Sequence, residues 1–229
     1  MKLETSLEKN IKIEFNNKDL LQQALVHRSY LNENPDFRLK DNERLEFLGD
    51  AVLELVVTDF LYQNYPNPEG ELTNWRAALV NAKMLTRVAD KLKLESRLLL
   101  SRGEAKDTGR ARRYILANAF EALVGAIYLD QGYSQAREFI ERIILKELPQ
   151  IIKEKLYQDP KSRFQEEAQE GVGITPTYEV IREWGPDHDK QFIVGVYLNK
   201  ELIAEGQGPS KQEAQEKAAE EALEKKGWN

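Results

Sequence analysis

The sequence contains no cysteine and only two histidines, and these scarcities narrow its chemistry. Without cysteine there is no disulfide framework, no thiolate zinc site and no cysteine nucleophile. His27 and His188 lie far apart in the 229 residues, so we do not expect a histidine-rich zinc or iron site. Oxygen-ligated magnesium or manganese is the metal chemistry that remains open.

Long apolar runs are also missing. The apolar stretches are short and interrupted by charges, and the first residues, MKLETSLEKN, lack the apolar core of a signal peptide. Hydrophobic residues make up 41% and charged residues 31% of the chain, which is typical of a folded globular protein. We therefore expect a cytosolic protein without a membrane partner.

An excess of positive charge is absent as well. The formal net charge is −6, and from Pro160 onward nine Lys and Arg residues stand against fourteen Asp and Glu residues. Taken alone, this argues against a nucleic-acid binder, because phosphate contacts need cations. Any such contact must come from a local basic cluster, and the sequence offers Arg102, Lys106, Arg110, Arg112 and Arg113.

The first part of the chain has the apolar spacing of helices and no convincing strand before residue 170. Helical patterns cover residues 17–30, a stretch from Asp41 or Asn42 to before Pro66, and about 71–94, 110–130 and 134–155. A polar loop separates the first two, and the turn-rich PNPEG ends the second. An all-helical domain over residues 1–156 is predicted.

After the segment LYQDP the pattern changes, so a linker is expected at residues 157–160. Residues 161–170 are helical, TYEVIREW and QFIVGVYL alternate at period two, and ELIAEG follows a tight turn at Asn199 and Lys200. A Lys-, Glu- and Ala-rich helix ends the chain. The order α-β-β-β-α predicts a second, small α+β domain over residues 161–229.

Three acidic residues share one face of the helix that begins near Asn42. Glu43, Glu46 and Asp50 are spaced three and four residues apart, which aligns them at about 100° per residue. A solvated acidic face is the ordinary interpretation. However, Arg44 is the only cation through Val57, so these acids lack partners along the helix. We therefore favour metal binding.

Two further features support that interpretation. Leu45, Leu48, Val52 and Leu55 are expected on the opposite, core-facing side of the same helix. Gly49 is unfavourable in a helix interior by about 0.5 to 1 kcal/mol relative to alanine, which suggests that something approaches the backbone beside Asp50.

A second polar pair lies in ILANAFEALVGAIYLDQGY, where Asn118 and Glu121 are three residues apart and face the same way. Their neighbours are apolar, and a buried carboxylate needs a cation or hydrogen bonds. Packed against Glu46 and Asp50, the pair would complete an oxygen cage for one or two magnesium ions. Phosphodiester hydrolysis needs an acidified water and a positive centre at the leaving oxygen, which such a cage can organise.

The string NERLEFLGDAVLEL closely resembles the signature of the ribonuclease III family, and ILANAFEALVGAIYLDQGY resembles its second acidic block. The α-β-β-β-α segment resembles the family's double-stranded RNA-binding domain, so the likeness covers nearly the whole chain. It implies an all-α endonuclease domain followed by a small α+β RNA-binding domain. The implied activity is divalent-metal hydrolysis of double-stranded RNA, leaving 5′-phosphate and 3′-hydroxyl ends with a short 3′ overhang.

The resemblance also implies residue roles. Glu46, Asp50 and Glu121 match metal ligands for Mg²⁺, with Mn²⁺ able to substitute, and Asp50 and Glu121 match the catalytic pair. Glu43 and Glu69 match supporting acids near the catalytic valley of a homodimer. Phe47 matches an aromatic that enters a socket on the partner, although plain core packing also fits its position. No small-molecule cofactor is implied; ribosomal RNA precursors, some mRNA and tRNA are the implied substrates.

Asn118 departs from the family, which normally has aspartate there. Its carbonyl can still ligate a hard cation, but the cage loses one negative charge, so we expect activity with a higher magnesium requirement. A dimer that binds double-stranded RNA without cleaving it is the alternative. An unrelated helical metal-dependent phosphohydrolase is a third possibility, which the α-β-β-β-α segment disfavours.

By the same resemblance, Gln165, Glu166 and His188 would face the minor grooves of an RNA duplex and Lys211 would reach phosphates. Gln212 stands where the family usually has a second lysine, so RNA affinity from this domain should be modest and salt-sensitive. A protein–protein module of the same fold is the alternative.

Overall fold

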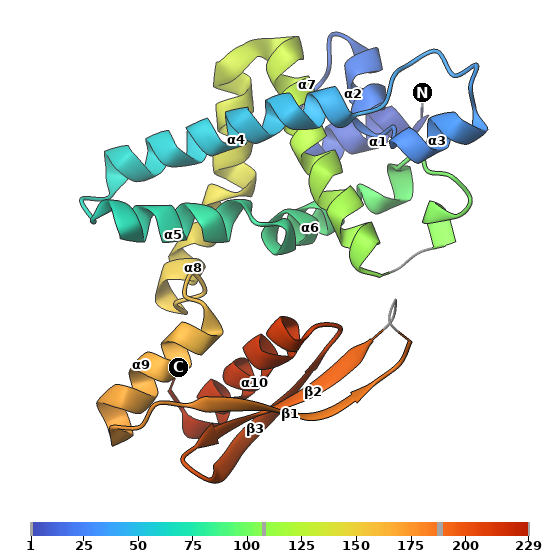
Figure 1. Cartoon of the computed structure of the whole chain (residues 1–229). Helices are drawn as coiled ribbons and strands as arrows, with labels where there is room; N and C mark the ends of the chain where they lie inside the picture. Colours follow the sequence, from blue (N-terminus) through green and yellow to red (C-terminus); the bar gives the residue numbers. More distant parts are fainter. Residues whose placement is uncertain (1, 107–108, 187–189, 229) are drawn as a thin grey trace. The chain divides into compact units, whose positions relative to one another are not determined.

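The computed structural model describes residues 2–106, 109–186 and 190–228, and the chain divides into two compact units (Figure 1). The first unit comprises Met1–Ile152 and the second Lys153–Asn229. In its described residues, the first unit is helical except for one isolated bridge, whereas the second combines helices with a sheet. The predicted fold class, a helical domain followed by a small α+β domain, is confirmed.

The first unit is arranged around two long helices, α4 and α7, which cross each other (Figure 1). The large side chains of Leu53, Phe120 and Leu123 are fully buried in its core. Its described helices are α1 (Lys2–Ile11), α2 (Lys18–Ala24), α3 (Arg28–Glu33), α4 (Glu43–Asn64), α5 (Glu69–Val80), α6 (Ala82–Lys91), α7 (Arg110–Ile143) and α8 (Leu148–Lys153), with 3-10 turns at Glu95–Arg97, Glu104–Lys106 and Leu145–Glu147.

Helix α4 begins and ends where the sequence predicts. Asn42 precedes its first turn, is buried, and donates a side-chain hydrogen bond to the Ala24 carbonyl at 3.2 Å. Its backbone N–H also bonds the Val26 carbonyl at 2.9 Å, which fixes the start of α4 against the segment after α2. The helix ends at Asn64, because Pro66 disfavours helical backbone at the residue before it.

The helix expected over residues 17–30 is divided in two. The chain leaves helical geometry after Ala24, and Val26 forms a parallel bridge with Leu99. The His27 backbone N–H bonds the Leu99 carbonyl at 3.0 Å, and the His27 ring then caps α3 by accepting from the Ser29 N–H. A contact with a residue more than seventy positions away therefore breaks a locally helical pattern.

The pattern expected over residues 71–94 also forms two helices rather than one. Asn81 has extended backbone between α5 and α6, and its side chain accepts a hydrogen bond from the Met84 N–H at 2.8 Å, which caps α6. The α1 helix was not anticipated from the sequence at all.

The interruption expected between residues 130 and 134 is present: Gly132 has non-helical backbone with a φ of 82°, and this kink divides α7 into two helical segments. The turn at Gly132 allows Phe139 to stack on Phe120 at a ring-centroid distance of 5.9 Å. The expected second helix ends at Ile143 rather than residue 155, and the shorter α8 follows it.

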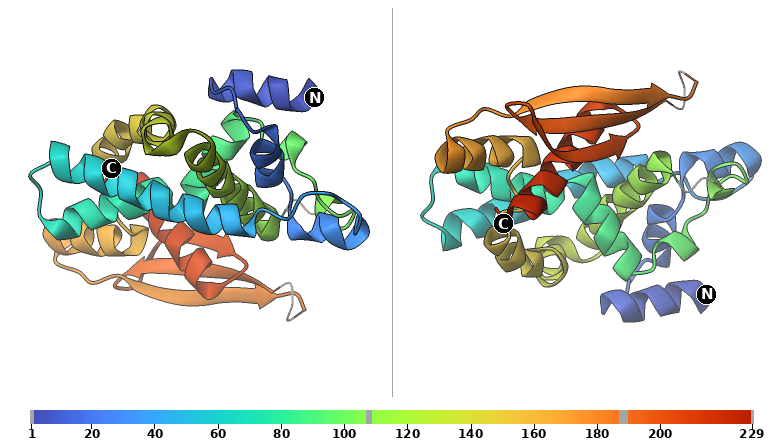
Figure 2. Two further views of the ribbon diagram at one scale, coloured as in Figure 1. Left: turned by 90° about the horizontal axis from the view of Figure 1, so that it is seen from above. Right: turned by 90° about the horizontal axis from the view of Figure 1, so that it is seen from below.

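The second unit contains α9 (Pro160–Val172), β1 (Thr177–Trp184), β2 (Gln191–Leu198), β3 (Glu201–Gly208) and α10 (Lys211–Lys226). The strands form an antiparallel sheet in the order β1-β2-β3, and both helices cover the same face (Figure 2). Asn199 takes a positive φ of 56° in the predicted tight turn between β2 and β3. Buried Phe164 of α9, Val196 of β2 and Ala218 of α10 share one core.

Within the described residues, no helix is long and apolar enough to cross a membrane.

Candidate active site

The acidic residues lie where α4 and α7 touch backbone to backbone. A Cβ atom built on Gly49 would lie 1.8 Å from the Glu121 carbonyl oxygen, and one built on Gly125 would lie 2.2 Å from that of Leu45. No side chain fits at either position. The close approach inferred from Gly49 is therefore confirmed, and the approaching element is α7. Gly125 was not singled out from the sequence, although it carries the same signal of a glycine inside a helix.

This crossing gathers four polar side chains from two helices. Glu46 and Asp50 come from α4, whereas Asn118 and Glu121 lie one turn apart on α7. Asp50 is exposed and the other three are partly buried, while Ala117, Ala119 and Phe120 beside Asn118 are fully buried. The expectation that Asn118 and Glu121 are not simply solvated agrees with this arrangement.

The carboxylates at the crossing affect one another's pKa values. Burial raises the pKa of Glu121 to about 8, and the negative charges of Asp50 and Glu46 add to the shift. Burial also raises the pKa of Glu46, with contributions from Glu43 and Asp50, and a side-chain hydrogen bond from Asn118 opposes that rise. The cluster thus carries mutual repulsion that a bound cation would relieve.

The donor set suits a hard divalent cation, since it consists of carboxylate oxygens and one amide oxygen. In the part of the chain that the structure describes, however, no three histidine, aspartate or glutamate side chains are gathered as a formed metal centre. The four residues are best described as an open cluster on a rigid helix crossing. The raised pKa values of Glu46 and Glu121 and the shared location of the four residues fit Mg²⁺ or Mn²⁺, which would have to draw the side chains inward.

The two acids that were expected to support the site, Glu43 and Glu69, lie outside this cluster. Glu43 lies in the first turn of α4, is exposed, and faces Arg28 with a nitrogen–oxygen distance of 3.4 Å. This ion pair comes from another element and was not visible in the helix's own sequence. Glu69 opens α5 beyond the opposite end of α4, so a single chain does not bring it to the crossing.

The side of α4 away from α7 carries exposed apolar side chains. The exposed fractions of Phe47, Leu55 and Tyr62 are 82%, 57% and 80%. Leu55 was expected in the core, and that prediction is wrong; the buried stripe instead includes Leu45, Gly49 and Val52. Core packing of Phe47 within its own chain is likewise excluded by its exposure.

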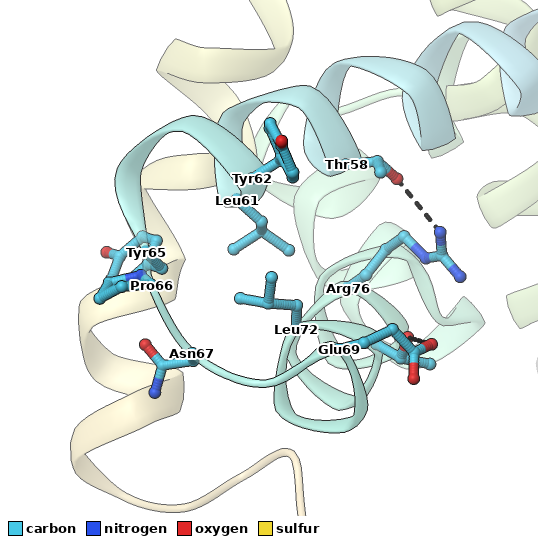
Figure 3. A pocket seen from close by; sticks show the side chains of 10 residues that line it. Thr58, Leu61, Tyr62, Tyr65, Pro66, Asn67, Glu69, Leu72 and Arg76 are labelled. Carbon is cyan, nitrogen blue, oxygen red and sulfur yellow. Dashed lines mark hydrogen bonds between the residues drawn. The ribbon is translucent and has the colours of Figure 1, made fainter.

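A pocket of about 630 Å³ lies between the C-terminal half of α4 and α5 (Figure 3). Its floor includes Leu61 and Leu72, and Tyr62 stands on its α4 side. Arg76 donates a hydrogen bond to the Thr58 hydroxyl at 3.2 Å and pairs with Glu54 at 3.1 Å. Glu69 also lines this pocket.

Comparisons with known proteins agree with the geometry. Residues 17–148 match the family model described as Ribonuclease-III-like, and residues 160–226 match the double-stranded RNA binding motif. Ribonuclease 3 of Borreliella burgdorferi is 46% identical over 93% of this chain and 87% of its own length. The chain belongs to the ribonuclease III family. Ribonuclease 3 of Enterococcus faecalis is 44% identical over 96% of each chain.

Solved structures support this membership in the ribonuclease III family for the helical unit. The nuclease domain of ribonuclease III from Campylobacter jejuni is 41% identical, with a TM-score of 0.58 over 65% of this chain and 98% of that domain. A second structure of the same domain, with a TM-score of 0.57, describes structural flexibility in its region involved in dimer formation. As a member of the ribonuclease III family, the chain is an endoribonuclease that acts on double-stranded RNA.

The RNA-binding unit of this ribonuclease III presents its predicted contact residues on the surface. Gln165 and Glu166 are exposed on α9, and exposed Lys211 opens α10 with its amine 5.7 Å from the Phe192 ring centre. Ser210 caps α10 by accepting from the Glu213 N–H. His188 lies outside the described residues.

The local basic cluster is only partly available for phosphate. Arg102, Lys106 and Arg113 are exposed, but Arg112 is engaged by Glu95 at 3.1 Å.

Proposed function

We propose that the chain hydrolyses both strands of duplex RNA with Mg²⁺, or Mn²⁺ in its place, and leaves 5′-phosphate and 3′-hydroxyl ends with a short 3′ overhang. The observation that supports this most is the location of Glu46, Asp50 and Glu121 at the α4–α7 crossing, where burial and charge repulsion raise the pKa values of Glu46 and Glu121. We assign Glu46, Asp50, Asn118 and Glu121 as metal ligands, and Asp50 and Glu121 as the catalytic pair.

The reaction adds water to phosphorus and breaks the bond to the 3′ oxygen, which takes a proton as it leaves. When bound, the metal ion makes water more acidic and offsets charge on the leaving oxygen. The chain holds its ligands on two helices whose relative position is fixed by the glycine contacts, which favours accurate placement of the reacting groups.

Cleavage of a long RNA duplex across magnesium and manganese concentrations tests this proposal. Glu121→Gln should abolish cleavage, whereas Asn118→Asp should lower the magnesium concentration needed for half-maximal rate. Glu138→Gln, an exposed acid on the same helix, serves as the matched control and should cleave normally. Mass spectrometry of the products should find 5′-phosphates.

The absence of cleavage by the wild-type chain at every metal concentration would overturn this mechanism. Retained duplex binding in that case would support the alternative, a dimer that binds double-stranded RNA without cutting it. The residue that favours this alternative is Asn118, because an asparagine in place of aspartate removes one negative charge from the cluster.

We further propose that the active form is a homodimer in which exposed Phe47 enters the pocket between α4 and α5 of a second copy. Two features support it: the apolar side chains on the exposed face of α4, and a nearby pocket with Leu61 and Leu72 in its floor (Figure 3). Such an arrangement would also bring Glu69, which lines that pocket, toward the neighbouring copy's site.

Sedimentation velocity checks the dimer. Wild type should sediment as a dimer at micromolar concentration, and Phe47→Ala should shift the population toward monomer. Leu129→Ala, which removes an apolar side chain of 53% exposure from α7, is the control and should leave the distribution unchanged. A monomeric wild type, or a fully dimeric Phe47→Ala variant, would contradict the proposal.

Cellular substrates are proposed from the resemblance alone: ribosomal RNA precursors, with some mRNA and tRNA. Transcripts of the double-helical stems of ribosomal RNA precursors should be cut at discrete sites, and unstructured RNA of equal length should not be cut.

A further inference from the structure

The exposed cations Arg102 and Lys106 lie on a segment that runs beside helix α3. This segment covers residues 99–106 and ends in the 3-10 turn Glu104–Lys106 (Figure 1). Among the residues that the structure describes, neither the Arg102 guanidinium nor the Lys106 amine has a hydrogen-bond or ion-pair partner. Both cations are therefore available to an anionic ligand, whereas Arg112 is already paired with an acid.

Two side chains of α3 accept hydrogen bonds from consecutive backbone N–H groups of this segment. The Ser29 hydroxyl accepts from the Ser101 N–H at 3.1 Å. The Glu33 carboxylate accepts from the Arg102 N–H, with both of its oxygens at 3.2 Å from the nitrogen. Because Ser29 and Glu33 are four residues apart, they lie on the same face of α3. These bonds fix the backbone at the residue that carries the Arg102 guanidinium.

The Ser29 hydroxyl is itself oriented by His27. The His27 Nδ1 atom accepts from the Ser29 N–H at 3.3 Å, so it is the ring nitrogen without a proton. It lies 2.8 Å from the Ser29 hydroxyl oxygen and can accept the hydroxyl proton as well. The lone pairs of that oxygen are then left to face the Ser101 N–H.

The same stretch of chain also holds the beginning of the acidic helix α4. The Leu99 N–H donates to the Leu25 carbonyl at 2.8 Å, and the Asn42 N–H donates to the neighbouring Val26 carbonyl at 2.9 Å. The basic segment and the first turn of α4 are thus attached to two consecutive residues. This arrangement fixes the position of the two cations relative to the helix that carries Glu46 and Asp50.

We propose that Ser29 and Glu33 are positioning residues that hold Arg102 and Lys106 in place for the backbone phosphates of the RNA duplex. The inference rests on the proposed function in taking the acidic cluster as the place where this duplex is bound and cut. Phosphates recur regularly along an RNA helix, so cations at a fixed distance from the cluster can contact them. A segment that is ordered beforehand loses less conformational freedom on binding, which increases affinity.

Glu33 separates an effect of position from an effect of charge, because the two predict opposite results. If charge alone mattered, removal of an exposed carboxylate would tighten RNA binding. If Glu33 holds the Arg102 backbone, Glu33→Ala should weaken binding, by up to the roughly eightfold that one phosphate contact supplies at about 0.1 M salt. Glu33→Gln loses the same charge but keeps an acceptor oxygen, so it should bind at least as tightly as wild type.

The matched control is Asp36→Ala, which removes another exposed acid three residues further along and should not weaken binding. Ser29→Ala changes no charge and should weaken binding, because the Ser101 N–H loses its acceptor. Thermal unfolding of each variant checks that the helical unit stays folded. Glu33→Ala that binds RNA as tightly as Asp36→Ala would overturn the proposal.

Affinity is measured for full-length chains in EDTA over a range of salt concentrations. The RNA is a duplex of roughly 32 base pairs, about twice the length that one double-stranded RNA-binding domain spans. Changing both Arg102 and Lys106 to alanine should reduce the slope of log affinity against log salt concentration by about two. An unchanged slope would exclude phosphate contacts by these cations and overturn the proposal.

A combined variant shows whether Glu33 acts through the two cations. In a chain that already carries Arg102→Ala and Lys106→Ala, Glu33→Ala should no longer weaken binding. The same loss in both backgrounds would contradict a positioning role. None of these measurements involves cleavage, so a wild-type chain that fails to cut RNA would refute the proposed function while leaving this result standing.

Discussion

Replacing Gly49 with alanine should damage both the stability and the activity of the helical unit. The added Cβ would lie 1.8 Å from the Glu121 carbonyl oxygen and 2.8 Å from the Gly125 nitrogen. Real Cβ atoms essentially never come within 3.0 Å of such backbone atoms, so α4 and α7 would have to separate by about 1.2 Å. Neither partner is a flexible side chain that could rotate away.

The required separation of the helices sets the size of the stability loss. Overpacking typically costs about 1 to 3 kcal/mol, and a displaced backbone belongs at or above the upper end of that range. For a chain of this size, about 3 kcal/mol lowers the unfolding temperature by roughly 6 to 12 °C. The same movement shifts Glu121 relative to Glu46 and Asp50, and a misplacement of about 1 Å can reduce a rate by about a hundredfold.

Differential scanning calorimetry and single-turnover cleavage of a duplex measure the two effects. Gly70→Ala is the control for stability, because a Cβ at Gly70 in α5 meets nothing within 4 Å. It should unfold at or slightly above the wild-type temperature, since alanine favours helix over glycine. A Gly49→Ala variant that unfolds and cleaves like wild type would refute the argument that the helix contact sets the site's geometry.

Three further predictions concern charge and the second unit. In EDTA, the stability of the helical unit should fall as pH rises from about 5 to 8. Glu121 has a pKa of about 8 in the folded form, against a usual 4.5, so in this range the folded form holds a proton that the unfolded form has released. Raising the pH therefore favours unfolding. Thermal unfolding of Glu121→Gln should show a flatter pH dependence, and identical profiles would be inconsistent with a buried acid. Gly206→Ala should lower the unfolding temperature of the second unit in calorimetry, because the added Cβ would lie 2.2 Å from the Ala218 nitrogen. Gly171→Ala is the control and should not lower it, because its Cβ would lie 3.7 Å from the Trp228 ring. Gln212→Lys, beside exposed Lys211, should tighten duplex RNA binding in a filter-binding assay. It should also steepen the slope of log affinity against log salt concentration by about one. Gln207→Lys on β3 is the control and should have a smaller effect.

The sequence correctly predicted the helices and strands whose ends depend on residues close by in the chain. Helix α4 begins after Asn42 and ends before Pro66, and the three strands show period-two alternation bounded by turns. The proposed acidic site also rests on local signals, namely three acids at helical spacing and a glycine inside the helix. Its proposed partners on α7, Asn118 and Glu121, interrupt an apolar surface.

Other features depend on contacts between distant residues. The interruption of the helix after α2 depends on the bridge between Val26 and Leu99, and no residue near position 26 predicts it. Leu55 has the spacing of a core residue, but the position of α7 determines which stripe of α4 is buried, and this leaves Leu55 exposed. By contrast, the break at Asn81 had a local sign that was missed: an asparagine able to cap the following helix.

The arrangement of the site depends on two opposing contributions, the repulsion between its carboxylates and the packing of α4 against α7. Carboxylates held close together repel one another, and nothing in their own chemistry keeps them there without a cation. Gly49 and Gly125 allow the α4 and α7 backbones to touch, and the buried side chains around them hold that contact. The packing of the two helices thus opposes the repulsion between the carboxylates. A change in the helix contact should therefore displace all of these acids at once and lower the stability of the unit, whereas the loss of one acid removes that side chain alone.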